Sequence, residues 1–362
     1  MKMAFRWFGP GDDPIPLSYI RQIPGVGQVV GALFDVPVGQ AWPTDKIAAL
    51  KDEVESAGLS LEVIESVNIH DDIKIGLPSR DEYIANYMTT IERLGQAGVK
   101  VICYNFMPVF DWMRTNLRMP LPDGSFAMSY DEAKLGASLE ETVKKMADAS
   151  DGFSLPGWEP ERLGDVRRLF EAYLPVDESV LVDNYRYFIQ AIMPACEKAG
   201  VAMAVHPDDP PWSIFGLPRV VKNIDDLRRI ESFDDSPLNG FTICAGSLGA
   251  DPANDVPAVL RELCGRGKVH FVHARNVKHT GYRQFHESSH LSSDGSYDMF
   301  AIIKALHDNH FKGYIRPDHG RDIWGERGRP GYGLYDRALG IAYINGLWEA
   351  LDSVPYSPRR VA

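Results

Sequence analysis

Hydrophobic positions in this chain repeat with a helical period, stop at a glycine, and then change to a short β-rich run. The segment that ends at Gly58 precedes Leu-Ser-Leu-Glu-Val-Ile, and the segments that end at Gly98 and Gly200 precede similar runs. A looser copy ends at Gly313. Glycine suits the left-handed backbone position that closes a helix. Repeated helix-then-strand units predict parallel strands joined by helices.

The pattern predicts about eight strands, with intervening helices. The strands are expected near residues 4–8, 28–34, 60–66, 99–105, 201–206, 240–245, 269–275 and 313–318. The helices are expected near residues 44–57, 80–97, 180–199, 255–265, 297–309 and 334–351. This arrangement favours an α/β (β/α)8 TIM barrel, whose active site lies at the carboxyl ends of the strands. A doubly wound open sheet is the alternative, but it would not explain why polar residues gather at four strand ends.

One interval between strands is much longer than the others. Nearly a hundred residues separate Asn105 from Val201, and they include the turn sequence Pro-Asp-Gly124. We therefore treat residues 1–362 as a single TIM-barrel domain with an insertion over about residues 107–181, between the fourth and fifth strands. We expect this insertion to add helices over the barrel mouth and to shape a pocket there.

Four of the expected strands end at a residue that can bind a metal ion: His206, Cys244, His273 and Asp318. Because residues two apart in a strand share a face, all four can point into the barrel together, whereas His270 falls on the opposite face from His273. A histidine at one strand end is more often a packing residue, and a lone buried cysteine usually acts as a small hydrophobe. The prediction therefore rests on the four together.

The mixed set of imidazole, thiolate and carboxylate is compatible with Mn²⁺, Fe²⁺, Co²⁺ or Zn²⁺. Its long spacings match no compact structural zinc motif. A site that is spread over four strands, with room for a substrate, favours catalysis.

Other polar residues are candidates for contact with a substrate. Arg275 shares a face with His273 and suits a carboxylate. Arg6, Trp7 and Asn105 end the first and fourth strands. His286 lies in an expected loop, and an incidental solvated histidine explains it equally well. The glycines around Tyr332 are typical of a mobile flap that swings over a site, whereas Tyr335 is better explained by helix packing.

Composition narrows the classes of partner. The net charge is −12 and the acidic residues are spread along the chain, which disfavours nucleic-acid binding because that needs basic surface. The chain lacks both a signal-peptide pattern and the roughly 18–20 consecutive apolar residues of a membrane span. Four cysteines without a Cys-x-x-Cys pair favour a reducing compartment, so we expect a cytoplasmic protein.

Several stretches, taken in order, resemble the D-mannonate dehydratase family of hexuronate catabolism. They are Arg6-Trp-Phe-Gly-Pro, Val101-Ile-Cys-Tyr-Asn-Phe-Met-Pro-Val-Phe-Asp-Trp, His206-Pro-Asp-Asp-Pro-Pro, Cys244-Ala-Gly-Ser-Leu-Gly, Phe285-His-Glu and Arg316-Pro-Asp-His-Gly. The resemblance implies a TIM barrel that holds Mn²⁺ or Fe²⁺ at the positions of His206, Cys244, His273 and Asp318. It also implies that His319 and a tyrosine of the following loop take part in catalysis. We place that tyrosine at Tyr332, with Tyr335 as the second choice.

Dehydration of D-mannonate to 2-keto-3-deoxy-D-gluconate needs a base for the proton on C2 and an acid for the hydroxyl on C3. His319 and Tyr332 are the candidates, and the sequence does not say which is which. The alternatives are a metal-dependent sugar isomerase or epimerase on a related barrel, a barrel endonuclease, and a metal-binding or sugar-sensing protein without catalysis. The expected partners are a sugar acid and a second copy of the chain in a homodimer, with neither nucleic acid nor membrane.

Overall fold

Eight parallel strands form a closed barrel in the computed structural model, which describes residues 1–136, 141–142, 144–145 and 166–353. Around the barrel the order is β1, β2, β3, β4, β7, β8, β9 and β12, and β12 pairs with β1. The predicted TIM barrel is confirmed, and the alternative prediction of a doubly wound open sheet is wrong. The barrel strands are β1 (Lys2–Arg6), β2 (Gln28–Gly31), β3 (Ser60–Glu65), β4 (Val101–Tyr104), β7 (Ala202–Val205), β8 (Asn239–Cys244), β9 (Val269–Ala274) and β12 (Tyr314–Pro317).

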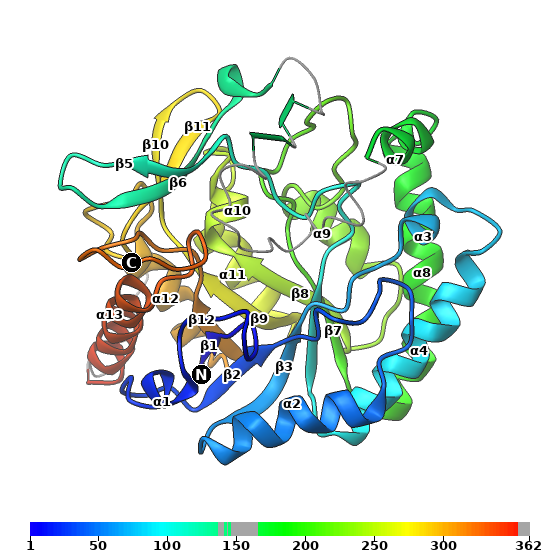
Figure 1. Cartoon of the computed structure of the whole chain (residues 1–362), viewed down its shortest axis with the longest axis horizontal. Coiled ribbons are helices and arrows are strands. Elements are labelled where there is room, and N and C mark those ends of the chain that lie inside the picture. The colour runs from blue at the N-terminus through cyan, green and yellow to red at the C-terminus, as the bar shows by residue number, and fades with distance from the viewer. Residues whose placement is uncertain (137–140, 143, 146–165, 354–362) are drawn as a thin grey trace, which may run out of the picture.

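Helices surround the barrel, as Figure 1 shows. Glycine ends helices as predicted, because Gly200 follows α8 with a left-handed φ of 64°. The predicted helices are all present: α2 (Thr44–Ser56), α4 (Arg80–Gln96), α8 (Glu178–Ala199), α11 (Val256–Gly265), α12 (Met299–Asp308) and α13 (Leu334–Ser353). The pattern missed four short helices, α1 (Leu17–Ile20), α3 (Asp71–Ile75), α9 (Ile224–Glu231) and α10 (Ala245–Gly249), which present too few turns for a helical period to be recognised.

The inside of the barrel is packed with mostly small side chains. Ala202 and Ala204 of β7 lie there with Phe271 of β9 and Tyr314 of β12. These residues occupy the same strand faces as His206, His273 and Asp318. The packing therefore confirms that the alternate residues of each strand from which the candidate ligands were chosen point into the barrel. The ligand candidates therefore continue the inner face toward the carboxyl ends of the strands.

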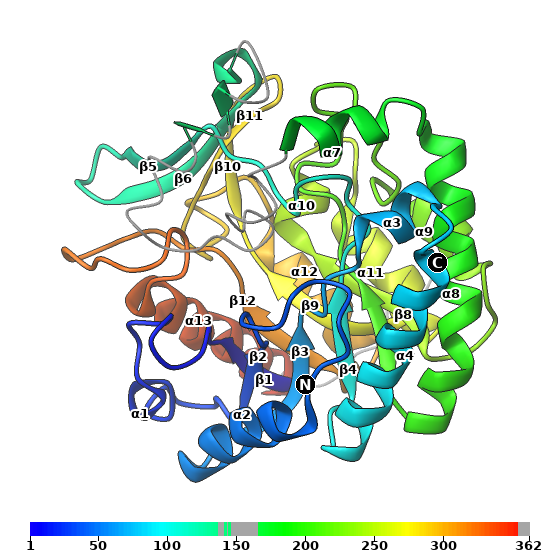
Figure 2. The same ribbon diagram turned by 45° about the vertical axis from the view of Figure 1, so that its right-hand side comes forward.

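A second sheet of four antiparallel strands stands beyond one end of the barrel, as Figures 1 and 2 both show. Its strands run in the order β10 (Val277–Gly281), β11 (Gln284–Glu287), β6 (Phe126–Asp131) and β5 (Asn116–Pro120). The first part of the insertion is thus a β-hairpin, and Gly124 takes a positive φ of 84° in its turn.

The expectation of a helical insertion is therefore only partly correct. The hairpin is followed by a 3₁₀ turn (Glu132–Lys134), and helix α7 (Val166–Tyr173) comes later in the insertion. Residues 137–140, 143 and 146–165 of the insertion lie outside the described residues. The local pattern could not predict the pairing of β6 with β11, because β11 lies about 150 residues further along the chain. Within the described part of the chain, none of the helices combines the length and apolar character needed to cross a membrane.

Candidate active site

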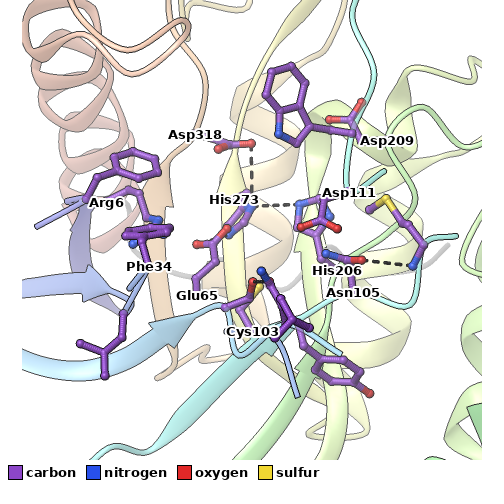
Figure 3. Close-up of a pocket in the computed structure, with 18 of the residues that line it drawn as sticks. Arg6, Phe34, Glu65, Cys103, Asn105, Asp111, His206, Asp209, His273 and Asp318 are labelled. Carbon is purple, nitrogen blue, oxygen red and sulfur yellow. Dashed lines mark hydrogen bonds and ion pairs between the residues drawn. The ribbon is translucent and has the colours of Figure 1, made fainter. Parts of the chain in front are cut away.

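The structure brings the four predicted metal ligands together. The nearest nitrogen, sulfur and oxygen atoms of His206, Cys244, His273 and Asp318 all lie within 4.8 Å of one another. Strand register explains this, because Cys244 is directly opposite His273 across β8 and β9. In Figure 3, dashed lines join His273 to Asp318 and to His206, and both contacts involve Nδ1 of His273.

Hydrogen bonding indicates how the two imidazoles are arranged. Nδ1 of His206 lies 2.6 Å from the carbonyl oxygen of Pro207, so this nitrogen must carry a proton and donate it. In a neutral ring, Nε2 of His206 then carries a lone pair instead of a proton. This nitrogen lies 3.1 Å from Nδ1 of His273. The other nitrogen of His273 lies 3.4 Å from a carboxylate oxygen of Glu65, an acceptor that favours a proton there. Two lone pairs that face each other at this distance favour a cation between them.

The thiol and the carboxylate fit the same interpretation. Sγ of Cys244 lies 3.6 Å from Oδ2 of Asp318, and the hydroxyl of Ser247 donates to that sulfur at 3.1 Å. Neighbouring ligands on a small divalent ion with bonds of about 2.1 Å are separated by about 3 Å. The distances between ligand atoms fit that geometry, so the residues present fit a divalent metal.

Charges around Asp318 keep it ionised. Burial opposes the ionised form, but neighbouring His319 and the Arg316 guanidinium hold the pKa of Asp318 well below its usual range. Arg316 donates to Asp318 at 2.7 Å and to both carboxylate oxygens of Glu65 at 3.0 and 3.2 Å. One guanidinium thus fixes a candidate ligand and the carboxylate that faces His273.

A cavity of about 390 Å³ opens onto these residues. Among the described residues that line it are Arg6 and Asn105, as predicted, together with His319 and Tyr332. Aromatic side chains form part of its wall: the ring of Phe8 stacks on that of Phe34 and meets that of Tyr332 edge-on. The volume is in the range of small-molecule sites.

Trp7, Arg275 and His286, which the sequence suggested as substrate contacts, are not among the described lining residues. The Trp7 indole nitrogen donates to the carbonyl of Ile15 at 3.1 Å. Arg275 is fully buried and pairs with acidic side chains. His286 pairs with β6 in the second sheet. The sequence identified their strands or loops, but not the partners that occupy their polar atoms.

His319 and Tyr332 form a pair next to the ligands. Nε2 of His319 lies 3.0 Å from the Tyr332 hydroxyl and 3.9 Å from Oδ1 of Asp318. Burial, reinforced by the carboxylate of Asp318, raises the pKa of Tyr332, so its hydroxyl stays protonated at neutral pH. Tyr335 lies in the first turn of α13 and is 42% exposed, with its ring 5.6 Å from that of Trp324. The structure therefore places Tyr332, and not Tyr335, beside His319.

Sequence reasoning did not assign a role to Glu65, Arg114, Asp209, Glu287 or Arg316. The position of Glu65 was readable, because it ends β3 on the same face as the inward Val63. Glu287 follows His286 in a stretch that carried the family resemblance. Asp209 lies in another such stretch, His206-Pro-Asp-Asp-Pro-Pro. Arg114 offered no comparable signal, since its contact with Asp209 joins segments 95 residues apart.

A closed (β/α)8 barrel that gathers two imidazoles, a thiol and a carboxylate at its strand ends defines a barrel protein with a candidate divalent-metal centre. The family model for D-mannonate dehydratase (UxuA) matches residues 1–357. The chain belongs to the D-mannonate dehydratase family.

Individual relatives agree with that membership. The chain is 57% identical over 355 residues to a mannonate dehydratase of Thermotoga petrophila, covering 98% of this chain and 99% of the relative. The crystal structure of mannonate dehydratase from Streptococcus suis serotype 2 matches with a TM-score of 0.88 and 44% identity, over 100% of this chain and 99% of the other. A D-tagatose 3-epimerase-like protein matches with a TM-score of 0.54 and 12% identity, over 97% and 98% of the two chains, which shows the fold alone.

Proposed function

We propose that this chain is a metal-dependent hydro-lyase that dehydrates D-mannonate to 2-keto-3-deoxy-D-gluconate and water in hexuronate catabolism. The observation that carries the proposal is the His319–Tyr332 pair, which lines one cavity together with the candidate ligands His206, His273 and Asp318. Removal of a proton next to a carboxylate needs a proton-transfer group beside a cation. Membership of the D-mannonate dehydratase family supports the same reaction.

We assign one divalent metal ion, Mn²⁺ or Fe²⁺, to the site. Its ligands would be His206, Cys244, His273 and Asp318. First-row divalent ions accept this mixture of imidazole, thiolate and carboxylate. When bound, such an ion supplies Lewis-acid polarisation of the substrate carboxylate, which lowers the cost of removing the proton on the neighbouring carbon.

The side chains of the protein then carry the proton transfers. A base removes the proton from C2, the electron pair of that bond forms the C2–C3 double bond, and the C3–O bond breaks. An acid protonates the departing hydroxyl, which leaves as water, and the enol that remains tautomerises to the ketone. We assign the two roles to His319 and Tyr332, whose reactive atoms are 3.0 Å apart.

Arg6 and Asn105 are our candidates for substrate binding, because both line the cavity. Burial lowers the pKa of Arg6 to about 10, so its guanidinium remains charged at neutral pH and can attract a sugar acid. One of its nitrogens donates to the carbonyls of Trp7 and Val30, at 3.0 and 2.9 Å, which holds the side chain in place.

The test is the His319→Asn variant, assayed with D-mannonate. We expect it to keep its metal and to lose about 10²–10⁴-fold in kcat, the usual contribution of a positioned acid or base. His307→Asn is a matched control, because His307 lies on α12 and pairs with Asp352 at the surface. A His319→Asn rate within about threefold of wild type would contradict the catalytic role.

Exchange of the C2 proton with deuterated solvent separates the two roles. A His319→Asn variant that neither dehydrates nor exchanges identifies His319 as the base at C2. A variant that exchanges without dehydrating identifies it as the acid for the leaving hydroxyl. Detection of a 2-keto-3-deoxy acid as product distinguishes dehydration from epimerisation, which releases no water. A homodimeric assembly and a cytoplasmic location stay predictions from the sequence.

A further inference from the structure

Two arginines and two carboxylates form a buried ionic cluster beside the cavity. The ionic cluster consists of Arg114, Asp209, Arg275 and Glu287, whose side chains are at most 3% exposed. Arg114 donates to both oxygens of Asp209 at 2.9 and 3.0 Å. Arg275 donates to both oxygens of Glu287 at 2.6 and 2.8 Å, and to Asp209 at 2.8 Å. Two positive and two negative charges leave the cluster neutral.

The ionic cluster joins the barrel to the second sheet. Arg275 and Asp209 follow β9 and β7 of the barrel, whereas Glu287 ends β11, and Arg114 comes shortly before β5. Figure 2 shows the second sheet, with β11 beside β6, standing apart from the barrel strands. The cluster therefore fixes the position of Glu287 relative to the strand ends.

One atom of the cluster reaches the proposed catalytic pair. Oε1 of Glu287 lies 3.2 Å from Nδ1 of His319, on the opposite side of the ring from Tyr332. We propose that Glu287 is a positioning residue that sets the tautomer of His319, so that Nδ1 carries the proton and Nε2 presents its lone pair to Tyr332 and the substrate. This inference rests on the catalytic role proposed above for His319.

The direction of each hydrogen bond follows from Glu287. Burial opposes its ionised form, but the guanidinium of Arg275 and the hydrogen bond from His319 lower the pKa of Glu287 to about 2. A carboxylate only accepts, so Nδ1 of His319 must donate. In the neutral ring Nε2 must then accept, and the Tyr332 hydroxyl donates to it. Before the reaction, the hydrogen-bonded chain from Glu287 through His319 to Tyr332 therefore contains an unprotonated Nε2 on His319, which can act as a base, and a protonated phenol on Tyr332.

The neutral ionic cluster limits what Glu287 does. Arg114 and Arg275 both donate to Oε1, which balances the negative charge that would otherwise face the imidazole. We therefore expect orientation and tautomer, more than a change in basicity, to be its contribution. In other enzymes the wrong histidine tautomer costs about 10⁴-fold in kcat even when the geometry is intact.

The test compares Glu287→Met with Glu287→Gln. Methionine removes the acceptor, and we expect kcat to fall about 10²–10⁴-fold with KM within about threefold and metal content unchanged. Glutamine can keep a carbonyl oxygen at the position of Oε1, where most of the contacts are. We therefore expect Glu287→Gln to stay within about tenfold of wild type. A fall in kcat of more than about 100-fold in a metal-loaded Gln variant would overturn the proposal, even if the Met variant does not fold.

A double-mutant cycle separates positioning from general stability. If Glu287 acts through His319, Glu287→Met should slow the His319→Asn enzyme by less than about threefold. Losses that multiply in the double variant would overturn the proposal. Asp226→Asn is the matched control, because it breaks the ion pairs that a largely buried carboxylate on α9 makes with Lys222 and Arg229, and Asp226 does not line the cavity. We expect it to lower the melting temperature and leave kcat within about threefold.

The two proposals fail in different ways. If His319→Asn turns over like wild type, the catalytic role of His319 fails. If His319→Asn is impaired while the folded Glu287→Met variant matches wild type, only the positioning role of Glu287 is overturned.

Discussion

The carboxyl ends of the barrel strands and the second sheet support the same candidate site in different ways. The barrel places His206, Cys244, His273 and Asp318 together through the register of parallel strands. In the second sheet, Glu287 of β11 is paired with Val277 of β10, and β11 also pairs with β6, a strand about 150 residues away in the chain. The barrel site follows from a repeated period, whereas the contact between Glu287 and His319 joins an antiparallel strand to a loop of the barrel.

The two regions also differ in their balance of charge. The four candidate ligands offer a thiol, a carboxylate and two imidazoles whose lone pairs converge, an arrangement that favours a cation. The ionic cluster already contains as many arginines as carboxylates, so it needs no added ion. The comparison shows that a group of buried polar residues suits a metal ion when its charges are not yet paired. When the charges are already paired, the group instead holds a neighbouring residue in position.

The largest expected effect comes from breaking the barrel site. Cys244→Ser and His206→Ala should each lose bound metal and at least about 10³-fold in activity, because each removes a ligand from the coordination shell. Elemental analysis and turnover would be measured on the same samples. Cys264→Ser on α11 is the matched control and should keep both properties. Full metal occupancy in the two ligand variants would disprove the assignment.

Removal of the metal tests the same site without changing the sequence. Treatment with a chelator should abolish turnover, and added Mn²⁺ or Fe²⁺ should restore it. The demetallated protein should also unfold more easily, since a ligand present at 100 times its Kd stabilises the native state by about 2.7 kcal/mol. Undiminished activity in protein shown by elemental analysis to be metal-free would count against a metal-dependent reaction.

The smallest expected effect concerns the link between the second sheet and the segment after His319. Asp322 exchanges backbone hydrogen bonds with Phe126 of β6 at 2.8 and 3.0 Å, and its side chain is 7% exposed. Burial raises the pKa of Asp322 to about 6, against the partial relief that Arg118 gives. Because the pKa of Asp322 is higher in the folded than in the unfolded protein, the protonated carboxyl stabilises the folded protein below about pH 4. This stabilisation is lost as the pH rises through about 6.

The free energy of unfolding of Asp322→Asn, relative to that of wild type, should therefore increase from pH 4 to pH 7, by up to about 2 kcal/mol. Urea unfolding at the two pH values measures the difference. Asp308→Asn, which alters a surface pair on α12, is the control and should show no such gain. A difference between Asp322→Asn and wild type that is the same at both pH values would show that Asp322 does not titrate in this way.

The sequence by itself determined the barrel and the group of candidate ligands. Gly58, Gly98 and Gly200 ended amphipathic segments, and all three take positive φ in the structure. The period of two in each strand predicted which side chains share the inner face, and the structure brings the four ligand candidates together as that period requires. Both signals are local, because they depend only on backbone geometry within a few residues.

Only the tertiary structure decided which polar residues face the substrate and which brace the site. Arg275 has the parity of His273, yet its guanidinium is taken up by Glu287 and Asp209. The β-hairpin in the insertion gains its place from β11, and Glu287 gains its role from contact with His319. These pairings join residues that are far apart in sequence, and the cost of burying an unpaired charge selects them only when the chain is folded.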